Sequence, residues 1–511
     1  MKSIRVYSDL YESYLHDESR LVGFAESISF PENEQELRRI VKTLYDTDVP
    51  ITVQGGLTGL TGGAVPQGGH ILNLSRMNKT LGLRRAENGK ILMRVEAGKL
   101  LQDIRAELRE KSFGTELQIS EQFFTPDPTE TTAAIGGMIA CNASGAMSYG
   151  YGAIREHIES IRLVLVDGDA FSLVRNSVFA QGRTLQLKTE AGRTLTVELP
   201  SYRMPKVKNA AGYFADDNMD AIDLFIGMGG TLGIITEAEI ALIEHPKEIW
   251  CALCFFEDDD AVPTFVDAVR KSSSHIKALE YFDKNAIGII TKAVKSGNAN
   301  FRFPSTLPEN NCAAVFVEIH ASQPDEAEDV LHLVGQIFEK SGENIENTWI
   351  TSSPAGREQM LRLRHAVPEN VNAIISERKK KDPTITKLGT DMAVPNPYLR
   401  EIMELYRSDL AVANLEYAIW GHIGNNHLHV NILPRSMEEY ARGTEIYHRW
   451  ADYVVARGGT ISAEHGVGRL KTDYLRIMYG HASFSEMAAM KKVFDAKYIL
   501  SPDVLFRISE I

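Results

Sequence analysis

The chain has 511 residues, 44% of them hydrophobic and 24% charged, with a formal net charge of −13. This length predicts two or three domains rather than a single core. The acidic balance argues against nucleic acid as a partner, because phosphate binding needs clustered lysine and arginine.

The composition also bears on the cell compartment. The N-terminal end is charged throughout and no apolar run approaches the ~18 residues that span a bilayer, so we expect no transmembrane segment. Only four cysteines are present, which favours a reduced, cytoplasmic protein, either free or peripheral to the membrane. Cys251 and Cys254 lie in an apolar run that predicts a buried strand. Their side chains would point to opposite faces, which argues against a shared redox or metal site.

The first glycine-rich stretch is QGGLTGLTGGAVP, from Gln54 to Pro66. Residues 34–45 before it have helical spacing, and the strand-like sequences PITV and HILNLS flank it, which favours a binding loop over a flexible linker. It contains neither the G-x-G-x-x-G nor the P-loop pattern. It also lacks lysine and arginine, so a bound anion would be held by main-chain N–H groups and threonine hydroxyls.

Two more glycine-rich stretches follow. Residues 131–146 are mostly small, which fits either close helix packing or a groove for a large flat ligand. The sequence after them predicts a hairpin that turns at Asp167–Gly168. One ligand with extended backbone contacts would account for all three stretches. The third run, FIGMGGTLGIIT, places four glycines on a predicted strand: Gly227, Gly229, Gly230 and Gly233.

Beyond about residue 245 the pattern changes. Strand-like runs (IWCALCFF, CAAVFVEIH) alternate with helical ones such as DEAEDVLHLVGQIFEKSG. This alternation predicts a second domain built on a sheet. From about 435 to 500 the pattern is helical.

The stretch GHIGNNHLHVN holds three histidines. If NHLHVNI is a strand, His427, His429 and Asn431 point to one face. His422 precedes a turn at Gly424 and could fold over to meet that face. Together with the downstream sequence AEHGVG, these residues indicate a metal site with imidazole and carboxylate ligands and an open position for substrate.

Five stretches in this order resemble the FAD-linked oxidases of the vanillyl-alcohol oxidase and p-cresol methylhydroxylase superfamily: GGLTGLTGGAVP, TAAIGGMIACNASG, GGTLGIIT, GHIGNNHLHVN and SAEHGVG. The nearest branch is that of the D-2-hydroxyacid dehydrogenases, which includes D-lactate dehydrogenase, the glycolate oxidase flavin subunit and D-2-hydroxyglutarate dehydrogenase. The resemblance implies an α+β fold with a p-cresol methylhydroxylase-type FAD-binding domain over residues 1–245. A ferredoxin-like α/β substrate domain would follow over 246–434, and a C-terminal helical segment over 435–511 would return to the flavin.

The resemblance also implies a cofactor, FAD. We expect it to be noncovalent, because the first glycine loop has no histidine, the residue to which covalent relatives attach the flavin. The residues implied to hold FAD are Gly55, Gly56, Thr58, Gly59, Gly62, Gly63, Gly136, Gly137, Asn142, Gly145, Gly233 and Ile235.

A divalent metal is implied as well. By resemblance His422, His429 and Glu464 are its ligands, and His427 is an extra histidine. Zinc is the first choice, while manganese and ferrous iron stay open, because all three accept nitrogen and oxygen ligands. Asn431 is expected to complete the site.

His465 is expected to be the base, and a nearby cation would help to keep it unprotonated near neutral pH. The substrate would chelate the metal through its carboxylate and hydroxyl. His465 would take the hydroxyl proton, and a hydride would pass from C2 to flavin N5.

Two arginines, Arg362 and Arg364, lie just before Pro368, which predicts a break or restart of a helix. The resemblance assigns the substrate carboxylate to Arg364, and a solvated helix arginine is the alternative. Pro368 and Lys387 differ from the pattern of the hydroxyglutarate enzymes, which favours lactate or another short acid.

The expected activity is therefore FAD-dependent oxidation of a D-2-hydroxyacid, D-lactate or a similar short acid, with glycolate or D-2-hydroxyglutarate as alternatives. Two interpretations come from other classes: a zinc hydrolase with purely structural glycine loops, and a non-catalytic electron-transfer flavoprotein subunit. The sequence lacks a four-cysteine cluster for an iron–sulfur centre. Electrons are thus expected to pass to an outside acceptor: an iron–sulfur subunit, an electron-transfer flavoprotein, a cytochrome or a quinone. The oligomeric state stays open, a homodimer included.

Overall fold

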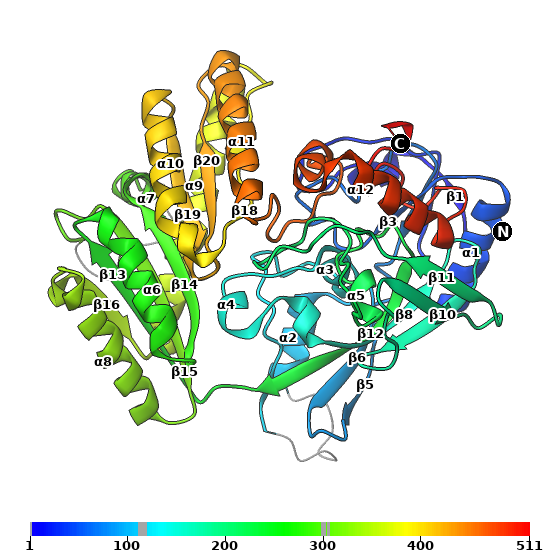
Figure 1. Cartoon of the computed structure of the whole chain (residues 1–511), viewed down its shortest axis with the longest axis horizontal. Coiled ribbons are helices and arrows are strands. Elements are labelled where there is room, and N and C mark those ends of the chain that lie inside the picture. Colours follow the sequence, from blue (N-terminus) through cyan, green and yellow to red (C-terminus); the bar gives the residue numbers. More distant parts are fainter. Residues whose placement is uncertain (1–2, 111–119, 298–302, 304–306, 511) are drawn as a thin grey trace.

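The computed structural model describes residues 3–110, 120–297, 303 and 307–510. Within them the strands form three larger sheets and a two-stranded hairpin, with helices packed against the sheets. Figure 1 shows the third sheet and its helices on one side, and the N-terminal half together with the last long helix on the other. The mixed α+β class predicted from the sequence is confirmed.

The first sheet lies in the N-terminal half, and the first glycine loop connects two of its strands, β3 and β4. Its inner strands are parallel, and its edge strand β1 runs antiparallel to β2. The predicted helix is α1 (Glu34–Asp46), which buries one apolar stripe and is capped by the Asn33 side chain on Glu36 N–H. The strand order β1-β2-β4-β3 comprises β1 (Arg5–Val6), β2 (Ser27–Ser29), β4 (His70–Asn73) and β3 (Ile51–Gln54).

The second sheet completes the N-terminal half and is antiparallel throughout. The predicted hairpin is present, and Gly168 at its turn has a φ of +82°, which favours glycine. The strand order β5-β6-β12-β8-β9, with β7 beside β12, comprises β5 (Thr80–Arg85), β6 (Ile91–Glu96), β12 (Ile234–Glu244), β8 (Ile158–Val164), β9 (Ala170–Val174) and β7 (Gln122–Phe123). A separate hairpin joins β10 (Thr184–Lys188) and β11 (Thr194–Glu198).

The prediction that the third glycine run lies on a strand is wrong. Strand β12 begins only at Ile234, after the glycines. Gly227, Gly229 and Gly230 have φ values of +94°, +66° and +72°, which a strand cannot accommodate. They form the turn before the strand, where a left-handed backbone is needed.

The third sheet supports the C-terminal half, and all of its strand pairs are antiparallel. Helices α6 (Val262–Ser272) and α8 (Pro324–Lys340) pack together, whereas α7 (Lys284–Lys295) packs with α9 (Pro354–Lys379). The strand order β16-β13-β15-β14-β19-β20-β17, with β18 beside β20, comprises β16 (Thr348–Thr351), β13 (Glu248–Phe256), β15 (Ala313–Ala321), β14 (Ile276–Asp283), β19 (Tyr417–His422), β20 (His427–Ile432), β17 (Leu388–Gly389) and β18 (Met392–Ala393).

Strand β13 shows how the sheet separates two apolar layers. Cys254 packs in the same cluster as the α6 and α8 side chains, and Cys251 packs in the cluster of α7 and α9. The two thiols therefore point to opposite faces, as the sequence predicted. Burial raises the pKa of both, that of Cys254 to about 12. Two separated, protonated thiols do not form a redox pair or share a metal.

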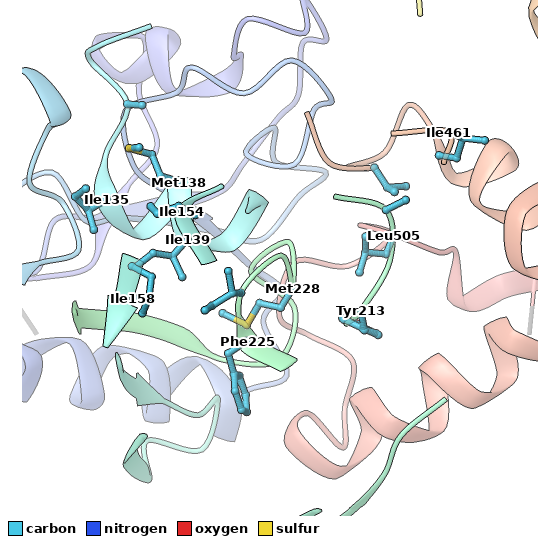
Figure 2. Packing of buried hydrophobic residues seen from close by; sticks show 14 of the residues in the cluster. Ile135, Met138, Ile139, Ile154, Ile158, Tyr213, Phe225, Met228, Ile461 and Leu505 are labelled. Carbon is cyan, nitrogen blue, oxygen red and sulfur yellow. The ribbon is translucent and has the colours of Figure 1, made fainter. Parts of the chain in front are cut away.

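The remaining helices are α2 (Leu101–Glu110), α3 (Ile135–Cys141), α4 (Ser148–Tyr151), α5 (Ile222–Phe225), α10 (Leu399–Val412), α11 (Met437–Ala456) and α12 (Thr472–Phe494). The segment after α12 returns to the first sheet, where Leu500 forms a parallel bridge with Ile51. Lys491 donates to Thr231 O at 2.8 Å. Figure 2 shows Leu505 and Tyr213 on one side of Met228, and the α3 residue Ile139 on the other, all in one buried cluster. The approach of this segment to a flavin stays a prediction. No helix within the described ranges combines the length and apolar character needed to cross a bilayer.

Candidate active site

A tight hairpin positions the three histidines. Strands β19 and β20 pair so that His422 faces His427, and Trp420 faces His429. Between them lies a single 3-10 turn, Ile423–Asn425. Gly421 has a φ of +126°, and a Cβ there would lie 2.8 Å from the His429 ring. The predicted strand is confirmed, and the hairpin brings the histidine before the turn onto the histidines after it.

Glu464 reaches this hairpin from the segment between α11 and α12. Its Oε1 lies 3.4 Å from His429 Nε2, and its Oε2 lies 3.2 Å from His422 Nε2 and 3.9 Å from His427 Nδ1. One ligand atom from each of the four side chains lies within 4.8 Å of the others, so they could hold a metal ion. The predicted ligands therefore converge, and His427 joins them. That they bind a metal stays a prediction.

The protonation of the rings fits a cation. His422 Nδ1 lies 2.6 Å from Glu280 Oε1, and His429 Nδ1 lies 3.2 Å from Thr390 O. Both partners only accept, so both Nδ1 atoms carry a proton, and a ring that is neutral presents its Nε2 lone pair. Burial lowers the pKa of His422, but Glu280 and Glu464 outweigh burial and raise that pKa above its usual value. Burial lowers the pKa of His429 and keeps that of His427 well below its usual value. His427 Nδ1 is buried without a hydrogen-bond partner. This nitrogen and oxygen donor set fits a divalent cation.

Asp391, which follows β17, holds the segment that carries Glu464 and His465. It is 1% exposed, and its Oδ2 accepts from Lys471 Nζ at 2.6 Å and from Ser462 Oγ at 2.7 Å. Its two oxygens also accept from the main-chain N–H groups of Glu464 and His465 at 3.2 and 3.1 Å. One buried carboxylate thus fixes the backbone on which both predicted residues stand.

His465 lies in the cluster, but its charge differs from the expectation. Its Nδ1 is 3.4 Å from Asp391 Oδ2, and its Nε2 is 3.3 Å from Glu464 Oε1. Burial lowers the pKa of His465, yet the two carboxylates outweigh burial and raise it to about 9. The expectation of a neutral imidazole near pH 7 rested on a nearby cation, and the protein groups alone favour the charged form.

The two predicted arginines have different environments. Arg362 pairs with Glu358 at the surface, with 59% of its side chain exposed. Arg364 is 12% exposed, and its Nε lies 3.0 Å from Glu280 Oε2. The alternative of a solvated arginine therefore holds for Arg362 and fails for Arg364. Through Glu280, Arg364 is linked to His422.

The predicted helix break at Pro368 is wrong. Helix α9 continues from Pro354 to Lys379 with Pro368 inside it. Val367 and Val371 on this helix are fully buried. Packing of this apolar face outweighs the hydrogen bond that proline cannot make.

The predicted cofactor glycines come together in space, and they fall into two groups. Some are required by packing or backbone conformation, and others leave their backbone open. A Cβ on Gly56 would lie 2.3 Å from Thr132 O, and one on Gly145 would lie 1.7 Å from Asp127 O, so packing alone requires both glycines. Gly55 and Gly136 are similarly crowded by Ala134 and Ala97, and Gly62 has a φ of +75°. By contrast Gly63 and Gly137 have nothing within 4 Å. The open sides are where a ligand could approach the backbone.

The three glycine stretches also contact one another. Gly227 and Gly229 donate to the carbonyls of Ile139 and Ala140 in α3. Asn142, in a left-handed conformation at the end of α3, donates to Asn209 O at 3.1 Å. This contact joins the stretches to the loop before α5. Gly233 and Ile235 lie at the start of β12, against Leu163 of β8. Thr58 and Gly59 belong to the first loop. Binding of FAD by these residues stays a prediction.

A cavity of about 260 Å³ lies between the glycine stretches and the histidine hairpin. Its lining includes Asn142 and Gly227 from the former and Asn425 from the latter. Lys208 lines it too, and Lys208 Nζ lies 2.7 Å from Glu464 Oε2. The predicted cofactor region and the predicted metal cluster therefore adjoin.

Sequence reasoning missed four charged residues here: Lys208, Glu280, Asp391 and Lys471. None belongs to a recognised motif. The one available signal is a charged residue in an apolar strand, as in KALEYF for Glu280, because a carboxylate in a central strand needs buried partners. Asn431 was predicted on the histidine face and lies on β20, paired with Gly389.

Two family models match the chain: the FAD binding domain over residues 25–173, and the C-terminal domain of the FAD linked oxidases over residues 245–505. The chain belongs to the FAD-linked oxidases. This FAD-linked oxidase is 26% identical to a D-lactate dehydrogenase of Anaerostipes hadrus, over 98% of this chain and 94% of the relative. It is 25% identical to the mitochondrial D-lactate dehydrogenase (cytochrome) 1 of Saccharomyces cerevisiae, over 94% of this chain and 72% of that one.

The solved structure of p-cresol methylhydroxylase with substrate bound has a similar fold, with a TM-score of 0.68 at 14% identity, over 99% of this chain and 95% of that chain. The family and fold that the five motifs predicted are therefore confirmed. Family membership makes the oxidase an FAD-dependent oxidoreductase, and the open sides of Gly63 and Gly137 fit the close approach of such a ligand.

Proposed function

We propose that this oxidase oxidises a short D-2-hydroxyacid, with D-lactate favoured, to the 2-oxoacid. In this proposal FAD is noncovalent, and a divalent metal, zinc by first choice, is held by His422, His429 and Glu464. The observation that carries it is the convergence of these side chains with His465, and with Arg364 through Glu280. The names of the two D-lactate dehydrogenase relatives support the substrate class.

The residues of the chain divide the chemistry between them. Arg364 binds the substrate carboxylate, because its Nε is already held by Glu280 and its Nη groups can form a bidentate contact. His465 Nε2 would accept the proton of the substrate hydroxyl once a bound cation offsets the carboxylates that otherwise keep the ring charged, and Asp391 at its Nδ1 fixes the orientation of the ring. When bound, FAD supplies a hydride acceptor and the cation polarises the hydroxyl and carboxylate oxygens.

The electron acceptor is proposed to be external, as the cytochrome in the name of the yeast relative suggests. The four cysteines of the chain are free thiols, and the two that share a strand, Cys251 and Cys254 of β13, point to opposite faces of the sheet. The candidates remain an iron–sulfur subunit, an electron-transfer flavoprotein, a cytochrome or a quinone.

The test is anaerobic reduction of the purified flavoprotein by a panel of acids: D- and L-lactate, glycolate and D-2-hydroxyglutarate. We expect D-lactate to bleach the flavin fastest and elemental analysis to find about one divalent metal per chain. His465→Ala should keep bound FAD and slow bleaching by ~10²–10⁴-fold, the range for loss of a general base. If no acid bleaches the flavin, or if His465→Ala is reduced at the wild-type rate, the proposal or its base is wrong.

A further inference from the structure

Glu280 contacts both halves of the proposed site. Its Oε1 lies 2.6 Å from His422 Nδ1, and its Oε2 lies 3.0 Å from Arg364 Nε. Glu280 stands on the central strand β14 and is 1% exposed. A carboxylate at this depth is costly unless its oxygens are paired, and each oxygen here has one specific partner.

The contact with His422 has a consequence for the cluster. The carboxylate only accepts, so it keeps a proton on Nδ1 and orients the ring with Nε2 toward the cluster, 3.2 Å from Glu464 Oε2. Carboxylates that hold an imidazole in this way orient metal-ligating histidines and raise their basicity.

The contact with Arg364 has a second consequence. The guanidinium is planar, with its five N–H groups in a fixed arrangement. Because Glu280 holds the Nε edge, the plane is set and the Nη groups are left for another anion. The next carboxylate, Asp127, lies 3.9 Å from Nη1, beyond hydrogen-bond distance.

We propose that Glu280 is a positioning residue that sets His422 and Arg364 at a fixed separation. This spacing selects substrates whose carboxylate adjoins the reacting hydroxyl, since one molecule must reach both the cation and the guanidinium. The inference rests on the proposed function and adds a determinant of specificity to it.

The chain offers a matched control on the neighbouring strand. Glu318 on β15 is also 1% exposed, and it lies 2.7 Å from His320 Nε2 and 2.8 Å from Arg357 Nη2. Arg357 precedes Arg364 by seven residues on α9, two turns earlier. The His320 Nδ1 is taken by the Tyr151 hydroxyl at 2.7 Å, so this histidine has no free nitrogen for a metal. The same chemical unit is thus present without a ligand role.

The experiment compares Glu280→Gln with Glu318→Gln as full-length flavoproteins. Metal affinity is measured by competition with a chromophoric chelator, together with FAD content, kcat and KM for the acid that reduces the wild type. For Glu280→Gln we expect a 10–100-fold loss of metal affinity and a KM raised at least about tenfold, with FAD retained. Glu318→Gln should keep wild-type metal affinity and KM.

Three outcomes separate the possibilities. Unchanged metal affinity and KM in Glu280→Gln would overturn the role of Glu280 and leave the proposed function standing. An equal loss of metal affinity in Glu318→Gln would do the same. A wild-type protein that binds no metal would instead contradict the proposed function on which this inference rests. If Glu280→Gln does not fold, Glu280→Asp replaces it. Asp keeps the charge but shortens the reach, so the same losses are expected and their absence is again decisive.

Discussion

Lys208 Nζ lies 2.7 Å from Glu464 Oε2, across 256 residues of sequence. The lysine belongs to a loop of the N-terminal half, and the carboxylate belongs to the predicted metal cluster. Ser144, in the second glycine stretch, also donates to Glu464 Oε2 at 3.3 Å. Both donors approach Oε2, which also lies 3.2 Å from His422 Nε2, whereas Oε1 lies 3.4 Å from His429 Nε2.

This pairing predicts the behaviour of Lys208→Met. The side chains of Lys208 and Glu464 are 5% and 11% exposed, and removal of one partner leaves a buried charge that costs about 3–5 kcal/mol. We therefore expect the metal-free variant to lose about that much free energy of unfolding. A divalent cation then compensates the carboxylate, so the stability gained on metal binding should exceed that of the wild type.

Thermal unfolding with and without chelator measures both quantities. Lys206→Met, an exposed lysine of the same loop, is the control and should match the wild type. A Lys208→Met variant with wild-type stability in chelator would show that the ion pair contributes nothing.

The second prediction separates the histidines of β20. His429 donates through Nδ1 to Thr390 O, so its Nε2 is presented to Glu464. His427 has Nε2 2.9 Å from Asp391 Oδ1, and its other nitrogen, Nδ1, lies farther from Glu464 than His429 does, at 3.9 Å from Oε2. We expect His429→Ala to lose metal affinity by more than about 100-fold, because a lost ligand exceeds the 10–100-fold cost of a lost outer partner. His427→Ala should stay within about tenfold of the wild type.

Titration of the apoproteins with zinc, followed by elemental analysis, decides between these side chains. The opposite ranking, with His427→Ala the more damaging, would make His427 the ligand and His429 the spare histidine. Equal, large losses would indicate that all four side chains bind the ion.

Local pattern explains which parts of the site the sequence could predict. Alternation along β20 placed His427 and His429 on one face, and the predicted turn at Gly424 allowed His422 to fold back. Motif order then linked Glu464 to them. Each of these inferences concerns neighbours along the chain, or a pattern that family members share, so no tertiary contact had to be known.

The missed features depend on tertiary packing. Lys208 and Glu280 act through contacts with distant segments, and no local periodicity marks such partners. Pro368 was misjudged for a related reason, because the rule about proline is local whereas the buried face of α9 is not. The glycines before β12 were placed on a strand by composition, although their positive φ values require a turn.

The third prediction concerns acid stability and His70, on β4 of the first sheet. Its ring is fully buried, with Ser27 Oγ 2.8 Å from Nδ1 and Ser29 Oγ 2.7 Å from Nε2. Burial lowers the pKa of His70 from 6.5 to about 4. Between these values the unfolded chain binds a proton that the folded chain does not. Stability is therefore complete above pH 6.5 and is lost as the pH falls toward 4, by about 3 kcal/mol in all.

His70→Gln removes the titrating ring and keeps a side chain that can hydrogen-bond to a serine. At pH 7 the variant should be the less stable protein, because the ring fits its site better. As the pH falls to 4 the wild type should lose about 3 kcal/mol that the variant keeps, so the gap in free energy of unfolding narrows or reverses. His332→Gln, at an exposed histidine of α8, should track the wild type at every pH. A gap between wild type and His70→Gln that stays constant from pH 7 to pH 4 would mean that burial does not keep this ring neutral.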